Sequence, residues 1–280
     1  MKKVFLLLIF PFMFFSQNNM RFTYRYDFAP NEFKKDSLIT NYMRLDTNGF
    51  ESNFYNEVKF KVDSIKKTSN DMGLIVNAGR MDRNLNYYIL KNYSNREVIY
   101  STKFTTIDFR IPETEIPVWK LDEERKLIGS WNCQKAKTYY KGRNWNAYFT
   151  SDIPINDGPY KFWGLPGFIV EIFSEDKSHK FSLIQIEKIE NPNIHYPPKN
   201  AKTISYEKYR EYLRNYKPTT ADIFAVNVNN GVSTYIMKDG NRVNIQISKE
   251  TLDKYRDNRK ELSQIILNKL GEQNSNPIER

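Results

Sequence analysis

The sequence predicts an α+β, β-rich protein in which a curved antiparallel sheet of about eight to eleven strands packs on a few helices. Aromatic residues make up 15% of the 280 residues, and aromatic side chains suit the pleated surface of strands. Residues 20–29 alternate between aromatic and polar side chains, which is typical of a half-buried strand. Apolar segments also recur on both sides of short turns, as they do in hairpins.

The elements of the first half follow from this periodicity. The buried face of the first strand should carry its aromatic side chains, Phe22, Tyr24, Tyr26 and Phe28. Further strands are predicted at residues 37–46, 86–92, 96–104 and 118–121. Between them, residues 53–68 follow a helical period, although residues 57–62 also fit a strand.

Residues 131–150 contain the clearest hairpin. Its turn is Lys141-Gly142, where glycine supplies the positive φ that a tight turn needs. A two-residue loop predicts one shared face, made of Gln134, Ala136, Thr138, Trp145, Ala147 and Phe149. Another hairpin is predicted from strands at residues 168–174 and 180–189.

The C-terminal third has a different character. Residues 191–200 are rich in proline and are predicted to be a linker. A helix capped by Ser205 is expected at residues 205–216, short strands at 224–247, and a long helix opened by Ser248 at 248–270. We therefore divide the chain into four parts. A signal peptide at residues 1–16 precedes a β-rich domain at 17–190. A C-terminal extension at 191–271, with two helices that pack on the main domain, is followed by a flexible tail at 272–280.

The first sixteen residues have the pattern of an export signal. Lys2 and Lys3 precede an apolar stretch, and Ser16 is a small residue at the expected cleavage position. The stretch is shorter than the roughly 20 residues that span a bilayer, and no later segment is long and apolar enough. We expect an exported protein without a transmembrane segment after cleavage, in the periplasm, at the outer membrane or outside the cell.

Charge and cysteine content narrow the function classes. Loss of Lys2 and Lys3 lowers the formal net charge from +10 to +8, and the remaining basic excess is dispersed. With export and no recognition motif, a nucleic-acid partner is not expected. The single cysteine, Cys133, is interpreted as a small buried hydrophobe, with a thiol catalyst beside Lys135 or Lys137 as the alternative.

Few side chains are suited to catalysis. The chain has two histidines and lacks metal, phosphate-loop and nucleophile-elbow motifs, so no metal, cofactor or catalytic residue is predicted. His179 lies in Lys-Ser-His-Lys and is expected at the surface. Asp152, Asp157 and Glu171 are interpreted as turn or surface carboxylates. The alternative is a carboxylate or serine hydrolase that acts on peptide or glycan.

The most distinctive segment is residues 157–169, DGPYKFWGLPGFI. Gly-Pro and Pro-Gly steps constrain its path between large side chains. With one residue of the preceding hairpin, these side chains are candidates for binding a ligand or partner: Tyr160, Phe162, Trp163, Leu165 and Trp145. The favoured interpretation of the side chains themselves is that they fill the end of the sheet as core residues, because burial is the commoner fate of large aromatic side chains.

Three stretches together resemble the GLPGLI family: residues 142–155, Gly158-Pro159-Tyr160-Lys161-Phe162, and Gly164-Leu165-Pro166-Gly167-Phe168-Ile169. Here the hexapeptide is GLPGFI, with Phe168 in place of leucine. The resemblance implies an exported protein of Bacteroidetes with no established activity, and no catalytic residue is carried over. The order of hairpin, loop and strand is also similar to periplasmic lipoprotein-carrier half-barrels, in which a curved sheet surrounds an apolar groove.

These observations lead to one expected function and two alternatives. We expect a non-enzymatic envelope protein that binds a lipid, another apolar or amphipathic ligand, or an outer-membrane protein beside the aromatic segment. The alternatives are the envelope hydrolase and a structural partner of a surface complex.

Overall fold

The computed structural model describes residues 19–31, 35–36, 38–69, 71, 73–74, 85–104, 107–215, 223–229, 232–237, 242–246, 248–255, 257–258, 261–262, 264–265, 268 and 278–279. The signal peptide predicted at residues 1–16 lies outside these residues. So do residues 269–277, which include most of the predicted tail.

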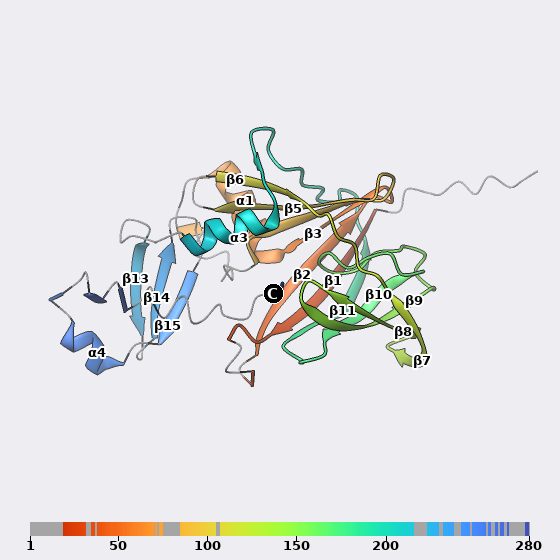
Figure 1. Ribbon diagram of the computed structural model, residues 1–280. Coiled ribbons are helices and arrows are strands. Elements are labelled where there is room, and N and C mark those ends of the chain that lie inside the picture. Colours follow the sequence, from red (N-terminus) through yellow and green to blue (C-terminus); the bar gives the residue numbers. More distant parts are fainter. Residues whose placement is uncertain are drawn as a thin grey trace, which may run out of the picture.

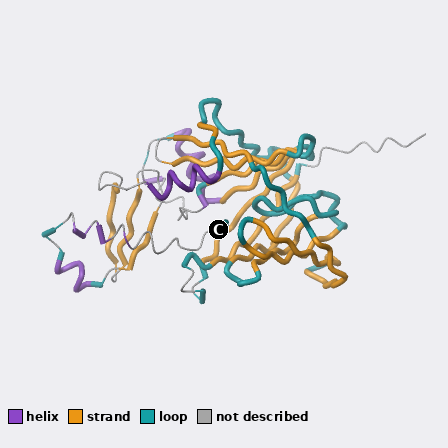
Figure 2. The backbone as a smooth tube through the Cα atoms, in the orientation of Figure 1, coloured by secondary structure: helices purple, strands orange, loops and turns teal. Residues whose placement is uncertain are grey.

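A twelve-stranded sheet dominates the structure (Figure 1, Figure 2), in the order β12-β6-β5-β4-β3-β2-β1-β11-β10-β9-β8-β7. Its strands are β1 (Met20–Phe28), β2 (Ile39–Thr47), β3 (Glu51–Asn56), β4 (Tyr87–Asn92), β5 (Glu97–Phe104), β6 (Ile107–Pro112), β7 (Lys120–Ile128), β8 (Trp131–Tyr140), β9 (Arg143–Thr150), β10 (Phe168–Ser174), β11 (His179–Lys188) and β12 (Lys202–Thr203). β12 pairs with β6 in parallel, and β1 pairs with β11 antiparallel. Two meanders, β1 to β6 and β7 to β11, therefore meet at the β1–β11 pair.

A smaller sheet and three labelled helices accompany the large sheet. The smaller sheet is antiparallel and contains β13 (Ile223–Asn229), β14 (Val232–Met237) and β15 (Arg242–Gln246). The helices are α1 (Glu57–Thr68), α3 (Tyr206–Asn215) and α4 (Lys249–Lys254). Helix α3 lies beside β5 and β6 (Figure 1), and its Tyr209 ring packs 5.4 Å from the ring of Phe109 on β6.

The large sheet is open and strongly curved. β6 and β9 are far apart in the strand order, yet Lys141 in the β8–β9 turn forms an ion pair at 2.6 Å with Glu113, which follows β6. Trp119, just before β7, donates its indole N–H to Trp163 O at 2.8 Å. A largely aromatic core joins these parts of the sheet. The predicted β-rich fold with a curved sheet is confirmed, but the large sheet has twelve strands instead of about eight to eleven, and one of its pairs is parallel.

Several predictions are confirmed at the level of single residues. Every aromatic ring on the predicted buried face of β1 is at most 3% exposed. The β8–β9 hairpin forms the predicted face through the pairs Thr138–Trp145, Ala136–Ala147 and Gln134–Phe149. Both turn residues have positive φ, 52° at Lys141 and 78° at Gly142, as a two-residue turn of this type requires.

The helix predicted at residues 53–68 begins later than the periodicity indicates. Residues 51–56 form β3, and α1 starts at Glu57. Asn56 ends the strand and caps the helix, because its side chain accepts hydrogen bonds from Val58 N and Lys59 N. The spacing of apolar residues does not show where a polar residue such as Asn56 ends a strand and caps a helix.

Two further elements differ in length from their predictions, and two were missed. β6 and the two-residue β12 were not predicted, and β7 continues to Ile128 instead of ending at residue 121. β7 is the edge strand and is exposed along most of its length, so its sequence lacks the alternation that marks a strand. The helix predicted at residues 248–270 is not continuous: α4 ends at Lys254 with Tyr255 as its C-cap, and the described residues 261–262, 264–265 and 268 are helical again.

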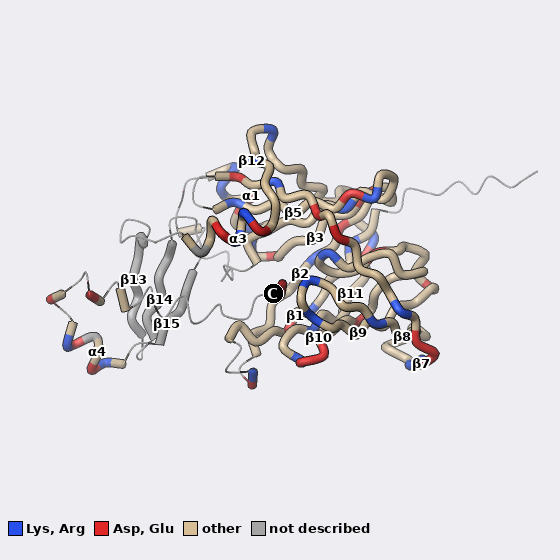
Figure 3. The backbone as a smooth tube through the Cα atoms, viewed as in Figure 1, with Lys and Arg blue, Asp and Glu red and all other residues tan. Residues whose placement is uncertain are grey.

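Basic and acidic residues are interspersed along the large sheet and its loops (Figure 3), as the dispersed charge of the sequence predicts. None of the described helices is long and apolar enough to cross a membrane. The division of the chain into domains stays a prediction.

Candidate functional site

The motif lies in the loop between β9 and β10, residues 151–167, which we call the motif loop. Its backbone is held by hydrogen bonds from Gly164 N to Asn156 O at 3.1 Å and from Ile169 N to Asp157 O at 2.9 Å. Gly167 has a φ of 149°, and a Cβ at this position would lie 2.2 Å from Thr150 O. Only glycine therefore fits where the loop returns against β9.

Asp157 anchors the motif loop inside the protein. Its Oδ1 accepts from Lys91 Nζ at 2.5 Å and from Gly158 N at 2.7 Å, and its Oδ2 accepts from Ser52 Oγ at 2.5 Å and Tyr93 OH at 2.8 Å. Burial lowers the pKa of Lys91, and the carboxylate of Asp157 opposes this effect. The turn role expected for Asp157 is present in the bond to Gly158 N, but its other three donors are distant in sequence, on β3, on β4 and in the turn after β4.

The structure brings together the five residues predicted to bind a ligand, as buried side chains. Each is at most 7% exposed: Trp145, Tyr160, Phe162, Trp163 and Leu165. The ring of Phe162 lies 4.7 Å from that of Trp145 and 6.2 Å from that of Tyr160. This burial agrees with the favoured interpretation that they fill the core, and their role in binding stays a prediction.

Lys161, between two of these aromatic residues, is the centre of a buried polar site. Its ammonium lies 2.7 Å from Glu113 Oε2, and Lys141 Nζ lies 2.6 Å from the other oxygen of Glu113. Burial alone would raise the pKa of Glu113, but Lys161 and Lys141 outweigh it and hold this pKa below its usual value. The rings of Tyr206 and Tyr100 lie 4.7 and 5.1 Å from the ammonium of Lys161.

The C-terminal end of the chain reaches into this site. Glu279 is 1% exposed, its Oε1 lies 2.6 Å from Lys161 Nζ, and the same oxygen accepts a hydrogen bond from Tyr160 OH. Burial raises the pKa of Tyr160 well above 10, and Glu279 raises it further, so the hydroxyl keeps its proton and donates. Arg143 Nε donates to Ile278 O at 3.2 Å, and the C-terminus is marked near the centre of the molecule in Figure 1.

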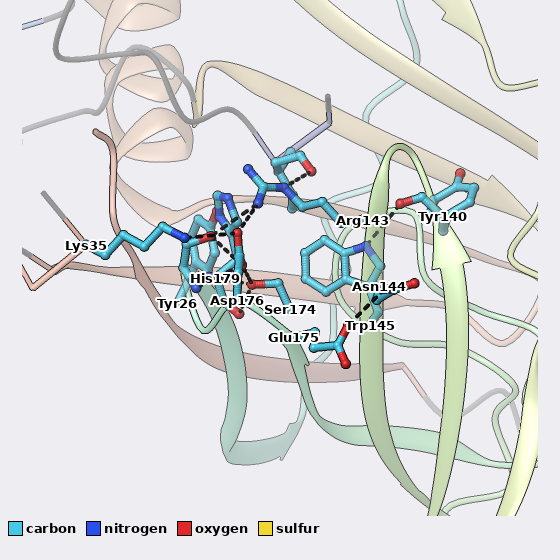
Figure 4. A network of polar contacts seen from close by, with 12 residues as sticks. Tyr26, Lys35, Tyr140, Arg143, Asn144, Trp145, Ser174, Glu175, Asp176 and His179 are labelled. Atoms are coloured by element: carbon cyan, nitrogen blue, oxygen red, sulfur yellow. Dashed lines mark hydrogen bonds and ion pairs between the residues drawn. The ribbon is translucent and has the colours of Figure 1, made fainter. Parts of the chain in front are cut away.

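A second polar network fixes the orientation of Arg143 (Figure 4). Its Nη1 donates to Asp176 Oδ2 at 2.8 Å and to Ser178 Oγ at 3.2 Å. Burial pushes the pKa of Asp176 upward, but hydrogen bonds from Ser174 and Ser178 and the charge of Arg143 outweigh it and lower this pKa. The carboxylate therefore stays ionised opposite the guanidinium.

The expectation that His179 lies at the surface is wrong. It is the first residue of β11, opposite Phe28 on β1, and it is 1% exposed. Its Nδ1 shares a hydrogen bond of 2.8 Å with Tyr26 OH, and its ring is parallel to that of Tyr26. Lys177 and Ser178 belong to the turn before β11, and along the strand the side chains alternate, so that His179 is buried while Lys180 is partly exposed.

The three carboxylates of the hydrolase alternative lie in different surroundings. Asp152 is exposed, Asp157 is bound to Lys91, and Glu171 lies between Lys180 at 2.7 Å and Lys126 at 2.9 Å. Among the described residues, no group of three metal-ligating side chains comes together. Cys133 is buried, and burial raises its pKa to about 11.

Sequence analysis missed the charged residues of the interior site. Lys161, Arg143, Glu113 and Glu279 come from four separate places in the chain, and each looks like an ordinary surface charge. One signal was available, because Lys161 stands between two aromatic residues of a constrained segment, where a solvated lysine is unexpected.

The fold and the site define a curved β-sheet protein with a buried carboxylate-holding site in its interior. A family model described as a protein of unknown function (Porph_ging) matches residues 138–171, which span the end of β8, β9, the motif loop and the start of β10. No curated protein matches the chain.

The fold is similar to two structures of PNGF-II. In the P21 space group, the match has a TM-score of 0.51 at 15% identity and covers 77% of this chain and 36% of that chain. In the C2 space group, the values are 0.50, 15%, 76% and 35%. The chain thus spans about a third of the length of PNGF-II. At this identity, the likeness concerns the fold alone.

Proposed function

We propose that the protein is a non-enzymatic binding protein of the cell envelope, of the GLPGLI type, that takes an amphipathic ligand with a negatively charged group into its interior. The Lys161 site carries this proposal, because a buried ammonium and the Tyr160 hydroxyl hold a carboxylate there among aromatic rings. An anionic group on an apolar body suits these surroundings, since its charge meets Lys161 and its body meets the core.

The candidate residues of the motif loop have defined parts in this proposal. Tyr160 donates to the anionic group, and Phe162 and Trp145 form apolar surface next to it. An envelope location is supported by the charged and apolar pattern of residues 1–16, which is typical of an export signal.

Native mass spectrometry of the mature protein, purified gently from its own envelope, tests the proposal. Because Glu279 occupies the site, the wild type and a Glu279→Ala variant are measured together. We expect the variant to carry an anionic adduct that Lys161→Met abolishes and that Lys103→Met, on an exposed lysine, leaves in place. Unliganded masses from both proteins, with the fold intact by circular dichroism, would contradict the proposal.

A second candidate function is contact with an outer-membrane protein at the β7 edge of the sheet. Val118, Leu127 and Tyr139, at or beside this edge, are 81%, 73% and 71% exposed. Exposed apolar side chains at an unpaired edge favour a protein contact. A photo-crosslinking residue in place of Leu127 should form an adduct with one outer-membrane protein in cells, and no adduct is expected from Lys103.

A further inference from the structure

The site holds Ile278 and Glu279 through three kinds of contact that together describe peptide recognition. Arg143 Nε donates to the main-chain oxygen of Ile278, and the side chain of Ile278 packs against the aromatic core. Lys161 and Tyr160 hold the carboxylate of Glu279. A main-chain anchor, an apolar contact and a charged anchor are the elements by which proteins bind short peptides.

The groups that bind these two residues are also held by contacts within the sheet and the motif loop, apart from those with the C-terminal segment. Arg143 lies on β9 and is held by Asp176 and Ser178, while Lys161 is held by Glu113. Tyr160 has a φ of 54° within the motif loop, and its ring packs 5.6 Å from that of Tyr87. Preorganised donors lower the ordering cost of binding any peptide that presents the same groups.

The electrostatics favour an acidic residue at this place. Without Glu279, Glu113 would be the one carboxylate paired with the ammonium of Lys161 among the described residues, and Glu113 is shared with Lys141. The C-terminal segment fits the site imperfectly, because Glu279 Oε2 is buried and has no hydrogen-bond partner among the described residues. A buried acceptor without a donor weakens an interaction, so a peptide that satisfies both oxygens would bind more tightly.

We infer that the interior site is a peptide-binding site specific for an aliphatic residue followed by glutamate, and that Ile278–Glu279 of the chain itself occupies it in competition with such a peptide. This inference rests on the proposed binding function and names its ligand class. The same two residues therefore report what the site recognises and limit access to it.

Fluorescence anisotropy on the full mature chain tests the inference. The probe is a fluorescein-labelled peptide with the sequence of residues 274–280, and the control peptide has glutamine in place of the glutamate. The proteins are the wild type, an Ile278→Ser/Glu279→Ala double variant, and the double variant with Lys161→Met. The double variant should bind the probe at least tenfold more tightly than the wild type does. The glutamine peptide and the Lys161→Met change should each cost about tenfold or more in affinity.

Two results would overturn the inference. Equal binding of the probe by the wild type and the double variant would show that Ile278–Glu279 does not compete with it. No binding by a folded double variant would show that the site does not recognise this peptide. Lys103→Met in the double-variant background is the matched control and should leave binding unchanged. If native mass spectrometry finds an anionic amphiphile lost with Lys161→Met while the peptide fails to bind, the proposed function stands and only the peptide inference fails.

Discussion

Lys91 Nζ on β4 lies 2.5 Å from Asp157 Oδ1 in the motif loop, and neither side chain is exposed. The ammonium also donates to Gly158 O at 2.6 Å, so one lysine holds both the side chain and the backbone of the loop. Two isolated buried charges would each be costly, and their stability depends on this pairing and on the hydrogen bonds around it. The motif loop is thus attached to the opposite meander of the sheet by a charge pair.

Lys91→Met should destabilise the protein strongly, because it leaves the carboxylate of Asp157 buried without its cation. We expect the free energy of unfolding in urea to fall by about 3–5 kcal/mol. Lys103→Met is the control, since Lys103 pairs with Asp108 at 3.9 Å on the surface and should cost less than about 1 kcal/mol. Similar losses in the two variants would show that the buried pair is not what attaches the loop.

Two glycines of the hexapeptide should respond differently to alanine. Gly167→Ala would place a Cβ 2.2 Å from Thr150 O, so the loop or β9 must move, and we expect a loss above about 4 kcal/mol. Gly164 has a φ of 87° with no atom within 4 Å of a Cβ, so Gly164→Ala should cost only about 1–2 kcal/mol from its backbone conformation. Thermal unfolding followed by circular dichroism measures both, and the reverse order would contradict the predicted clash.

His195 should make stability depend on pH between 6.5 and about 4. Its ring stacks 4.0 Å from Tyr88, and burial, with the nearby charge of Lys59, lowers its pKa to about 4. In this window the unfolded chain binds a proton that the folded protein does not, so the free energy of unfolding falls as the pH falls. We expect a loss on the order of 2 kcal/mol between pH 7 and pH 4.5.

The variant His195→Phe keeps the stacked ring and removes the titration. Urea unfolding at several pH values should show a flatter profile for this variant above pH 4.5. The carboxylates whose pKa values are lowered, such as Glu113, act mainly below that pH, because their stabilisation is lost as the pH falls below their unfolded values. Identical slopes for the wild type and His195→Phe would refute the assignment to His195.

Cys133 should be unreactive in the folded protein. Its side chain is fully buried, and burial raises its pKa to about 11, so little thiolate is present at pH 8. We expect a disulfide reagent that releases a coloured thiolate to react slowly with the native protein and rapidly in urea. Fast reaction of the native protein at pH 8 would instead support the thiol-catalyst alternative.

The local pattern of the chain predicts more of the fold than of the site. Alternation places the aromatic face of β1, and the two-residue turn at Lys141-Gly142 determines which residues face one another across β8 and β9. These features depend on neighbours a few residues away. β7 escaped the same reasoning because exposure at the sheet edge removes its alternation, whereas β6 does alternate, with Phe109 and Ile111 buried, but is short and ends at Pro112.

The sequence by itself determined the β-rich class, most strands, the hairpin register and the buried aromatic residues, because period and turn chemistry are local properties. The tertiary structure alone decided the burial of Lys91, Lys161 and His179 and the contact of Glu279 with the motif loop. A charge is stable in the interior only beside a partner. The curvature of the sheet provides these partners, because it brings together the end of β6, the β8–β9 turn, the motif loop and the C-terminal end. No local sequence pattern predicts these contacts, since the residues that form them lie far apart along the chain.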